Sequence, residues 1–560
     1  MGTNQILKKV FLSILLSYLC ITVSSQTAPA KYWIKFTDKN NNSYQLSSPE
    51  QFLSQRALDR RQRQNIAIEE KDLPVTQMYI DSLESLGLVI LNTSKWFNSV
   101  TVYSTDTALL DTVTNLSFVA QLDKVMKYKN GDATQSYFYE QSVAAAYVSH
   151  NSAKNLLDYG LATAQIAMHR GQILHNNGYM GQGIQIAITD AGFYKVDIFP
   201  AFDSLWQNSQ ILGYKDFVHD GVDFSNQHSH GMNVLSVVGA NIPGQMIGTA
   251  PKASYWLLRS EDAGTEYSIE EDNWVTAAEF ADSVGADVIN VSLGYETFDD
   301  TSQNHTYSDM DGNTTRVSIG ADIAAGKGMI VVVSAGNSGN KPWHYIGTPA
   351  DADSVLTVGS VDGFKNYSDF SSTGPTADNR IKPDVAAIGS SATFQTSAGT
   401  IGTGNGTSFS APIMTGLVAC LWQANPDLSN MDIIEFIRKS SHQYDNPDSL
   451  MGYGIPDFAY ANLLIQGIQY LDLDNENYIV TYPNPFNNEI CVEFYSVDSQ
   501  SVTIEIYDLL GKLVLGNNYK LNMTSYNRIR ITDLNSLAPG SYFAKIITKN
   551  KTYQEQIVKQ

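Results

Sequence analysis

The stretch that decides the fold is Ile184-Gln185-Ile186-Ala187-Ile188-Thr189-Asp190-Ala191-Gly192-Phe193. It begins with a short, almost continuously apolar run, which is typical of a strand buried on both faces. The run ends at an aspartate, and a glycine allows the chain to turn. Similar apolar runs recur at Val288–Val291, Met329–Val333 and Val355–Val358, with helical stretches between them. This alternation predicts an α/β domain built on a parallel sheet with helices on both faces.

Polar residues stand where these predicted strands end, which is where functional residues gather in such sheets. Asp190 ends the first strand. Ser292-Leu293-Gly294 follows the second strand, and Ser334-Ala335-Gly336-Asn337-Ser338-Gly339 ends the third. Each of these motifs, taken alone, is also explained as a turn at the end of a strand.

A histidine and a serine stand near two predicted helix starts. His230 opens a helically spaced stretch that continues with Gly231, although His228 is a rival two residues away. Ser408 lies in Gly404-Asn405-Gly406-Thr407-Ser408-Phe409-Ser410-Ala411-Pro412, before a helix predicted over residues 413–422. A glycine-rich turn into a helix lets the backbone approach a substrate and directs N–H groups at negative charge. A surface histidine and a helix-capping serine are the alternatives for each motif alone.

These motifs together resemble the subtilases, the subtilisin-like serine peptidases, whose catalytic residues follow the chain order Asp, His, Ser. The resemblance covers residues 156–466. It implies a secreted serine endopeptidase that works through an acyl-enzyme, with Ser408 as nucleophile, His230 as general base and acid, and Asp190 orienting His230. It also implies that Asn337 binds the oxyanion and that the segment Ser292, Leu293, Gly294 binds substrate.

Two departures from the family pattern stand out. Met232 and Asn233 follow His230-Gly231, where family members usually have Thr and His, and Ala191 follows Asp190, where Ser or Thr is common. These residues flank the predicted catalytic groups without replacing them. They affect the expected shape of the substrate subsites more than the expected catalysis.

The chain before the peptidase region is predicted to contain two targeting and processing segments. Lys8 and Lys9 precede an apolar run and then small residues, which is the pattern of a signal peptide, predicted as residues 1–25. Residues 26–150 mix strands with a basic helix predicted over Ser48–Gln64, and their size and pattern resemble an inhibitory, folding-assisting propeptide. We expect self-cleavage in the polar stretch of residues 130–155.

The last section, residues 475–560, is predicted to be a β-sandwich. Val502–Tyr507 alternates between apolar and polar residues, and turns follow at Gly511 and Pro539-Gly540. Tyr482-Pro483-Asn484-Pro485-Phe486 and the segment from Ile506 to Lys512 resemble the C-terminal sorting domain of type IX secretion in Bacteroidetes-like bacteria. An accessory carbohydrate- or surface-binding sandwich stays open, because fold alone does not give function.

Composition limits the partners. A net charge of −21 argues against a nucleic-acid backbone as the main partner, and three cysteines give no disulfide framework. The expected partners are protein or peptide substrates, the chain's own propeptide and the type IX machinery, with no permanent membrane anchor. The expected location is outside the cell or on its surface.

No cofactor is expected to be required, and no metal site is predicted. Asp309-Met310-Asp311-Gly312-Asn313 offers oxygens suited to calcium, but its spacing misses a full EF-hand loop, so a structural calcium has no support and a polar hairpin is favoured. The main alternative function is a non-catalytic surface or adhesion protein on a protease fold, against which the complete set of four motifs argues. An acid-active relative with Glu in place of the catalytic His is disfavoured by His230-Gly231.

Overall fold

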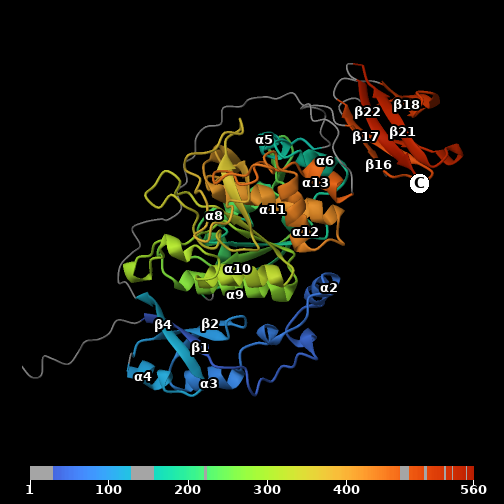
Figure 1. Ribbon diagram of the computed structural model, residues 1–560. Coiled ribbons are helices and arrows are strands. Elements are labelled where there is room, and N and C mark those ends of the chain that lie inside the picture. The colour runs from blue at the N-terminus through green and yellow to red at the C-terminus, as the bar shows by residue number, and fades with distance from the viewer. Residues whose placement is uncertain are drawn as a thin grey trace, which may run out of the picture. The chain divides into compact units, whose positions relative to one another are not determined.

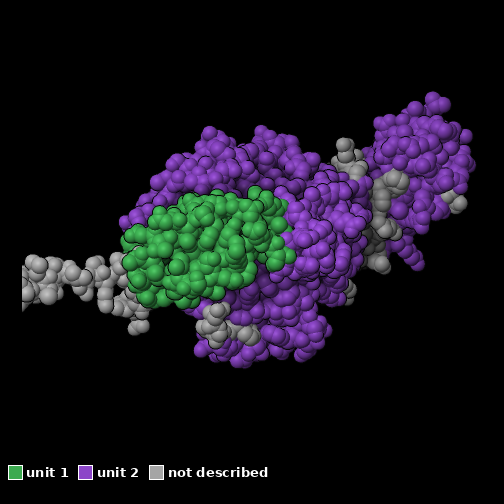
Figure 2. All heavy atoms as spheres, turned by 90° about the horizontal axis from the view of Figure 1, so that it is seen from below, with its two compact units in different colours: residues 1–43, 70–132, 267–269 green, residues 44–69, 133–266, 270–560 purple. Residues whose placement is uncertain are grey.

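The computed structural model describes residues 30–106, 108–127, 157–219, 223–466, 479–482, 484–496, 501–521, 525–532, 534–549 and 552–560. The predicted signal peptide and the stretch expected to be cleaved lie outside the described residues. The chain divides into two compact units, coloured separately in Figure 2. Unit 1 contains residues 1–43, 70–132 and 267–269, and unit 2 contains the remainder.

Unit 1 is a small α+β domain, as predicted for the propeptide. Its antiparallel sheet has the order β2-β3-β1-β4 and is accompanied by two helices. Alternate strand residues and one helix face bury a common core that includes Ile34, Leu83 and Val102. The elements are β1 (Ala30–Phe36), α3 (Gln77–Ser85), β2 (Val89–Ser94), β3 (Ser99–Ser104), α4 (Ala108–Thr114) and β4 (Val119–Lys127).

A seven-stranded parallel sheet forms the centre of unit 2, which confirms the predicted fold class. The strand order is β13-β12-β11-β10-β5-β9-β6, so β5, which ends at Asp190, lies inside the sheet between β10 and β9. The strands are β5 (Gln185–Asp190), β6 (Ile211–Asp216), β9 (Ser254–Arg259), β10 (Val288–Val291), β11 (Ile330–Ser334), β12 (Leu356–Val361) and β13 (Val385–Ile388). Two short antiparallel pairs accompany it: β7 (Asn241–Ile242) with β8 (Met246–Ile247), and β14 (Ala392–Gln395) with β15 (Ile401–Gly404).

Helices cover both faces of this sheet (Figure 1). On one face lie α8 (His230–Gly239) and α11 (Thr407–Ala424), and on the other lie α9 (Ile269–Val284) and α10 (Arg316–Gly326). The smaller helices of this unit include α5 (Thr163–Ala167), α6 (Gly171–Asn176), α7 (Asp203–Gln207), α12 (Asn430–Lys439) and α13 (Phe458–Ile465). Helix α11 is apolar on nearly every side and is buried over most of its length, as expected for a helix in a core.

The helix predicted to start after Pro412 begins earlier, at Thr407, so that prediction was wrong in its boundary. Proline inside a helix lacks the N–H that would bond to the carbonyl four residues before it, here the carbonyl of Ser408. The Ser292 hydroxyl donates to this Ser408 carbonyl oxygen at 3.0 Å and replaces the missing bond. Ser408 therefore lies in the first turn of the helix.

Residues 44–69, which fall inside the predicted propeptide, pack in unit 2, and we call them the arginine arm. The helix predicted over Ser48–Gln64 is shorter: α2 spans Gln55–Arg63. Pro49 begins a separate 3-10 turn, and the Ser54 hydroxyl accepts from the Ala57 N–H at 3.2 Å and caps α2. Helix α2, capped by Ser54, therefore begins later than the predicted start at Ser48.

Two buried arginines of the arm pair with one buried aspartate of helix α9. Arg60 and Arg61 are 0% and 1% exposed, and each donates to the Asp282 carboxylate, at 2.6 and 2.8 Å. Asp282 is itself 0% exposed. Beside this cluster, Arg56 pairs with Asp287, the residue just before strand β10. Buried charges of this kind are tolerated only when they are paired and hydrogen-bonded.

The arm also satisfies backbone carbonyls just beyond two helix ends. Arg56 Nε donates to the Gly285 carbonyl after α9 at 2.9 Å, and Arg60 Nε donates to the Lys327 carbonyl after α10 at 3.2 Å. Gln64 donates to the Gly328 carbonyl at 2.8 Å. The carbonyls at a helix C-terminus lack intrahelical partners and carry partial negative charge, so arginine side chains stabilise such ends.

The C-terminal section of the chain forms two antiparallel sheets, which confirms the predicted β-sandwich. The sheet orders are β16-β17-β20 and β19-β18-β21-β22, and their inward residues share one apolar core that includes Val492, Ile504 and Ile557. The strands are β16 (Ile479–Tyr482), β17 (Ile490–Ser496), β18 (Ser501–Asp508), β19 (Leu513–Lys520), β20 (Ser525–Ile531), β21 (Gly540–Ile547) and β22 (Thr552–Lys559). Across the described residues of the chain, no helix combines the length and apolar character needed to cross a bilayer.

Candidate active site

Asp190 and His230 form a direct hydrogen-bonded pair. Asp190 is the last residue of β5, and His230 is the first residue of α8. His230 Nδ1 lies 2.8 Å from Asp190 Oδ1 and 3.0 Å from Oδ2, while the Ala191 N–H donates to the same carboxylate at 2.7 Å. The carboxylate is fully buried and the imidazole is 6% exposed. This geometry fixes the orientation of the ring through Nδ1.

Two glycines make this close approach possible. A Cβ on Gly231 would lie 2.5 Å from the Gly192 carbonyl oxygen and 2.8 Å from Asp190 Cβ. A Cβ on Gly192 would lie 2.6 Å from the His228 backbone nitrogen. Any side chain at these positions would separate α8 from the end of β5, so the Asp-Ala-Gly and His-Gly motifs are explained by packing around the pair.

The rival histidine, His228, has a different position. Its Nδ1 accepts a hydrogen bond from the backbone N–H of His230 at 3.2 Å. His228 therefore contacts the first turn of α8, whereas the side chain of His230 makes the contact with Asp190.

Ser408 lies at the start of α11, next to the end of strand β10. Its Oγ donates to the Ser292 carbonyl at 3.4 Å, and the Ser292 hydroxyl donates back to the Ser408 carbonyl at 3.0 Å. The neighbouring Phe409 ring centroid lies 6.4 Å from that of His230. The structure thus brings the serine motif, the histidine motif and the Ser292-Leu293-Gly294 segment together. Within that segment Leu293 is buried and Gly294 is exposed.

Asn337 is held against the residue that precedes Ser408. Its Oδ1 accepts from the Thr407 N–H at 2.9 Å and from the Thr407 hydroxyl at 3.0 Å. The amide oxygen is therefore occupied, and the amide Nδ2 lies toward the glycine turn, 3.8 Å from where a Cβ on Gly406 would be. Thr407 is a supporting residue that sequence reasoning did not single out, although it stands beside the serine in the motif.

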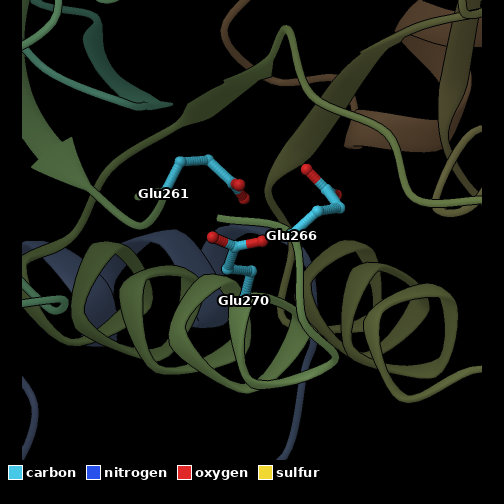
Figure 3. Close-up of side chains that lie close together, drawn as sticks. All are labelled: Glu261, Glu266 and Glu270. Carbon is cyan, nitrogen blue, oxygen red and sulfur yellow. The ribbon is translucent and has the colours of Figure 1, made fainter. Parts of the chain in front are cut away.

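Three glutamates lie close together near this site, as Figure 3 shows: Glu261, Glu266 and Glu270. Burial, assisted by the nearby Asp190 charge, raises the pKa of Glu261 to about 8, although the hydrogen bond that the Tyr295 hydroxyl donates to this carboxyl group lowers it. Burial raises the pKa of Glu266 well above its ordinary value. With a pKa of about 8, Glu261 is mostly protonated at neutral pH and adds little negative charge beside Asp190.

The segment with calcium-like spacing uses its carboxylates locally. Asp309 accepts from the Thr306 N–H at 2.7 Å, and Asp311 accepts from the N–H groups of Asn313 and Thr314, each at 2.8 Å. These bonds form a 3-10 turn and the loop before α10 rather than the predicted hairpin.

Comparisons with known proteins agree with this fold. The subtilase family model matches residues 181–454, the Bacteroidota peptidase S8 propeptide model matches residues 31–139, and the secretion system C-terminal sorting model matches residues 480–560. Subtilisin DY from Bacillus licheniformis is 31% identical over 258 residues, covering 45% of this chain and 81% of that protein. The chain belongs to the subtilase family, and it is a serine endopeptidase with a propeptide.

Other relatives are more distant. Subtilisin E from Bacillus subtilis is 26% identical over 330 residues, covering 58% of this chain and 74% of that protein. The crystal structure of MycP1 from Mycobacterium smegmatis is 23% identical with a TM-score of 0.43, covering 58% of this chain and 89% of that one. The sorting domain marks the chain for export to the medium or the cell surface.

Proposed function

We propose that the chain hydrolyses internal peptide bonds of extracellular proteins through a triad of Asp190, His230 and Ser408. The observation that carries the assignment is the 2.8 Å contact between His230 Nδ1 and the buried carboxylate of Asp190. Such a pair holds the imidazole in the tautomer and orientation that a general base needs, and it stabilises the imidazolium that forms during the reaction.

In this mechanism Ser408 Oγ attacks the carbonyl carbon of the scissile bond while His230 Nε2 accepts its proton. The tetrahedral oxyanion receives hydrogen bonds from Asn337 Nδ2 and the Ser408 backbone N–H. His230 then donates the proton to the leaving amine, which leaves an ester on Ser408. Water, deprotonated by His230, attacks the ester and releases the acid. The substrate is held as an added strand along Ser292, Leu293 and Gly294.

The test compares the purified parent with Ser408→Ala and His230→Ala on casein and on a fluorophosphonate probe. Each variant should lose on the order of a million-fold in turnover, the loss known for subtilisin itself. Ser302→Ala, a change at an exposed serine, is the matched control and should label like the parent. His228→Ala separates the two histidines: if it abolished labelling while His230→Ala did not, the triad assignment would be wrong.

The full chain is an exported zymogen in this proposal, with the propeptide as its inhibitor. Cleavage between residues 130 and 155 should accompany the appearance of activity, and Ser408→Ala should stay uncut. A fully active protein with Tyr32 to Lys129 still covalently attached would contradict the zymogen assignment. Deleting the residues after 475 removes the sorting domain and should leave the protein in the periplasm. Normal release of the truncated chain would contradict the sorting function of this domain.

A further inference from the structure

One acidic side chain lies at the end of the predicted substrate-binding segment and was not part of any motif. Glu296 comes two residues after Gly294, and the intervening Tyr295 bonds to Thr348 through both backbone groups, at 2.8 and 3.3 Å. The Ser338 hydroxyl donates to both carboxylate oxygens of Glu296 at 3.1 Å. Ser338 directly follows Asn337, so the carboxylate lies beside the proposed oxyanion residue.

Two glycines leave space around this carboxylate. A Cβ on Gly336, the residue before Asn337, would lie 3.8 Å from Glu296 Oε1. A Cβ on Gly347 would lie 3.1 Å from Glu296 Cγ and 3.4 Å from its Oε1. The Glu296 side chain therefore occupies the floor between the segments of residues 292–294 and 336–338. It remains half-buried rather than sealed from solvent.

These same two segments flank the nucleophile. Ser408 bonds to Ser292 on one side, and Asn337 bonds to Thr407 on the other. A substrate carbonyl placed between Ser408 Oγ and Asn337 Nδ2 would send the side chain of its own residue toward the space between the segments. The group that this side chain meets at the far end is the carboxylate of Glu296.

We propose that Glu296 determines cleavage specificity by receiving a lysine or arginine side chain from the residue that supplies the scissile carbonyl. The inference rests on the proposed peptidase function. A guanidinium or ammonium group suits the site because a half-buried carboxylate gains most from a charge-assisted hydrogen bond, and a long methylene chain covers the distance from the backbone to the floor.

The charged groups nearby agree with an added cation. Burial raises the pKa of Glu296 to about 7, although the hydrogen bond from Ser338 and the neighbouring Lys341 charge both lower it. Burial raises the pKa of Glu266, the nearby acid, and the His305 ring is paired with Glu271 at 2.6 Å. A substrate cation would therefore meet a carboxylate whose ionisation it favours.

The test uses four fluorogenic peptides that differ only in this one residue: arginine, lysine, leucine, or citrulline, which is the neutral analogue of arginine. We expect the parent enzyme to prefer arginine over citrulline in kcat/KM by about tenfold to a hundredfold, the range of a charge-assisted hydrogen bond. In Glu296→Gln this ratio should fall to near one, while the rate on the leucine peptide changes by less than about threefold. Glu435→Gln, at a half-exposed position on α12, is the matched charge control and should keep the parent ratio.

Fluorophosphonate labelling is measured in every variant, so that folding and specificity are separated. A labelled, casein-cleaving parent with an arginine-to-citrulline ratio near one would overturn the specificity assignment and leave the peptidase function intact. An unchanged ratio in labelled Glu296→Gln would overturn it as well. A parent that failed to label would overturn both. The arginine-to-citrulline ratio of the parent should also rise from pH 6 to pH 8, because Glu296, with a pKa of about 7, becomes ionised over this range. A ratio that did not change with pH would count against the role of Glu296 in specificity.

Discussion

Replacing Asp282 by asparagine should loosen the arginine arm from the body of unit 2. The substitution keeps the size of the side chain but removes the negative charge that Arg60 and Arg61 share at 2.6 and 2.8 Å. All three side chains are at most 1% exposed, so water cannot replace the lost charge. Removing one partner from a buried ion pair costs about 3–5 kcal/mol. We expect the opening free energy of the arm to fall by that amount.

Hydrogen exchange of the backbone amides in α2 measures this quantity directly, because it reports local opening free energies. The protein used is the uncut Ser408→Ala zymogen. Since about 1.4 kcal/mol corresponds to tenfold, the α2 amides of Asp282→Asn should exchange about a hundredfold to a few thousandfold faster than those of the parent.

Arg63→Gln is the matched control on the same helix. Arg63 is 48% exposed and lies 3.8 Å from Asp287, so its pair should contribute less than about 1 kcal/mol, or about fivefold in exchange. If Asp282→Asn changed exchange no more than Arg63→Gln does, the reasoning that burial makes this ion pair strong would be refuted.

Three further predictions concern the site. Asn337→Ala should lower kcat by about a hundredfold to a thousandfold with little change in KM, as known for subtilisin itself, while Asn340→Ala at an exposed position serves as the kinetic control. The folded-state pKa of Glu261, about 8, lies above its ordinary value of 4.5, so ionisation of this group opposes folding. The folding stability of the parent should therefore fall as pH rises between those two values. The thermal midpoint of Glu261→Gln should depend less on pH from 5 to 8 than that of the parent. If Glu296 receives basic side chains, self-cleavage should follow Lys154, the one lysine or arginine between residues 130 and 155. Mass spectrometry of the mature protein should then find Asn155 at its N-terminus. A different N-terminus would argue against the role of Glu296 in specificity.

Local signals in the sequence predicted the site because each candidate residue stands at the end of a strand or the start of a helix. Asp190 and Asn337 follow buried apolar runs, and such runs specify both the parallel sheet and its carboxyl edge. Gly192 was predicted to let the chain turn after Asp190, whereas the close approaches at Gly192 and Gly231 became visible only in the structure. Sequence alone therefore placed Asp190 at the end of its strand and His230 at the start of its helix, whereas Ser408, expected in a turn before the helix, lies in its first turn.

The features that sequence reasoning missed depend on contacts between distant segments. Glu296 lies just after the predicted substrate-binding segment, but its position beside Asn337 is visible only through its hydrogen bond with Ser338, which is 42 residues away in the sequence. The sequence predicted a basic helix in the arm but gave no sign of its burial; Arg60 and Arg61 are buried because they donate to Asp282 and because Arg60 also donates to carbonyls after α9 and α10. The spacing of residues along the chain does not predict hydrogen bonds or ion pairs between segments that are far apart in the sequence.

The contacts of the arginine arm would separate cleavage of the zymogen from release of the cut fragment. The proposed cut between residues 130 and 155 would end the covalent link but would leave the ion pairs of Arg56, Arg60 and Arg61 with Asp282 and Asp287 in place. From then on departure of the fragment becomes an equilibrium set by concentration, since a bound segment that is no longer tethered obeys mass action. In a confined compartment the cut fragment rebinds, and in the surrounding medium dilution removes it. Export itself would then act as the trigger that completes activation.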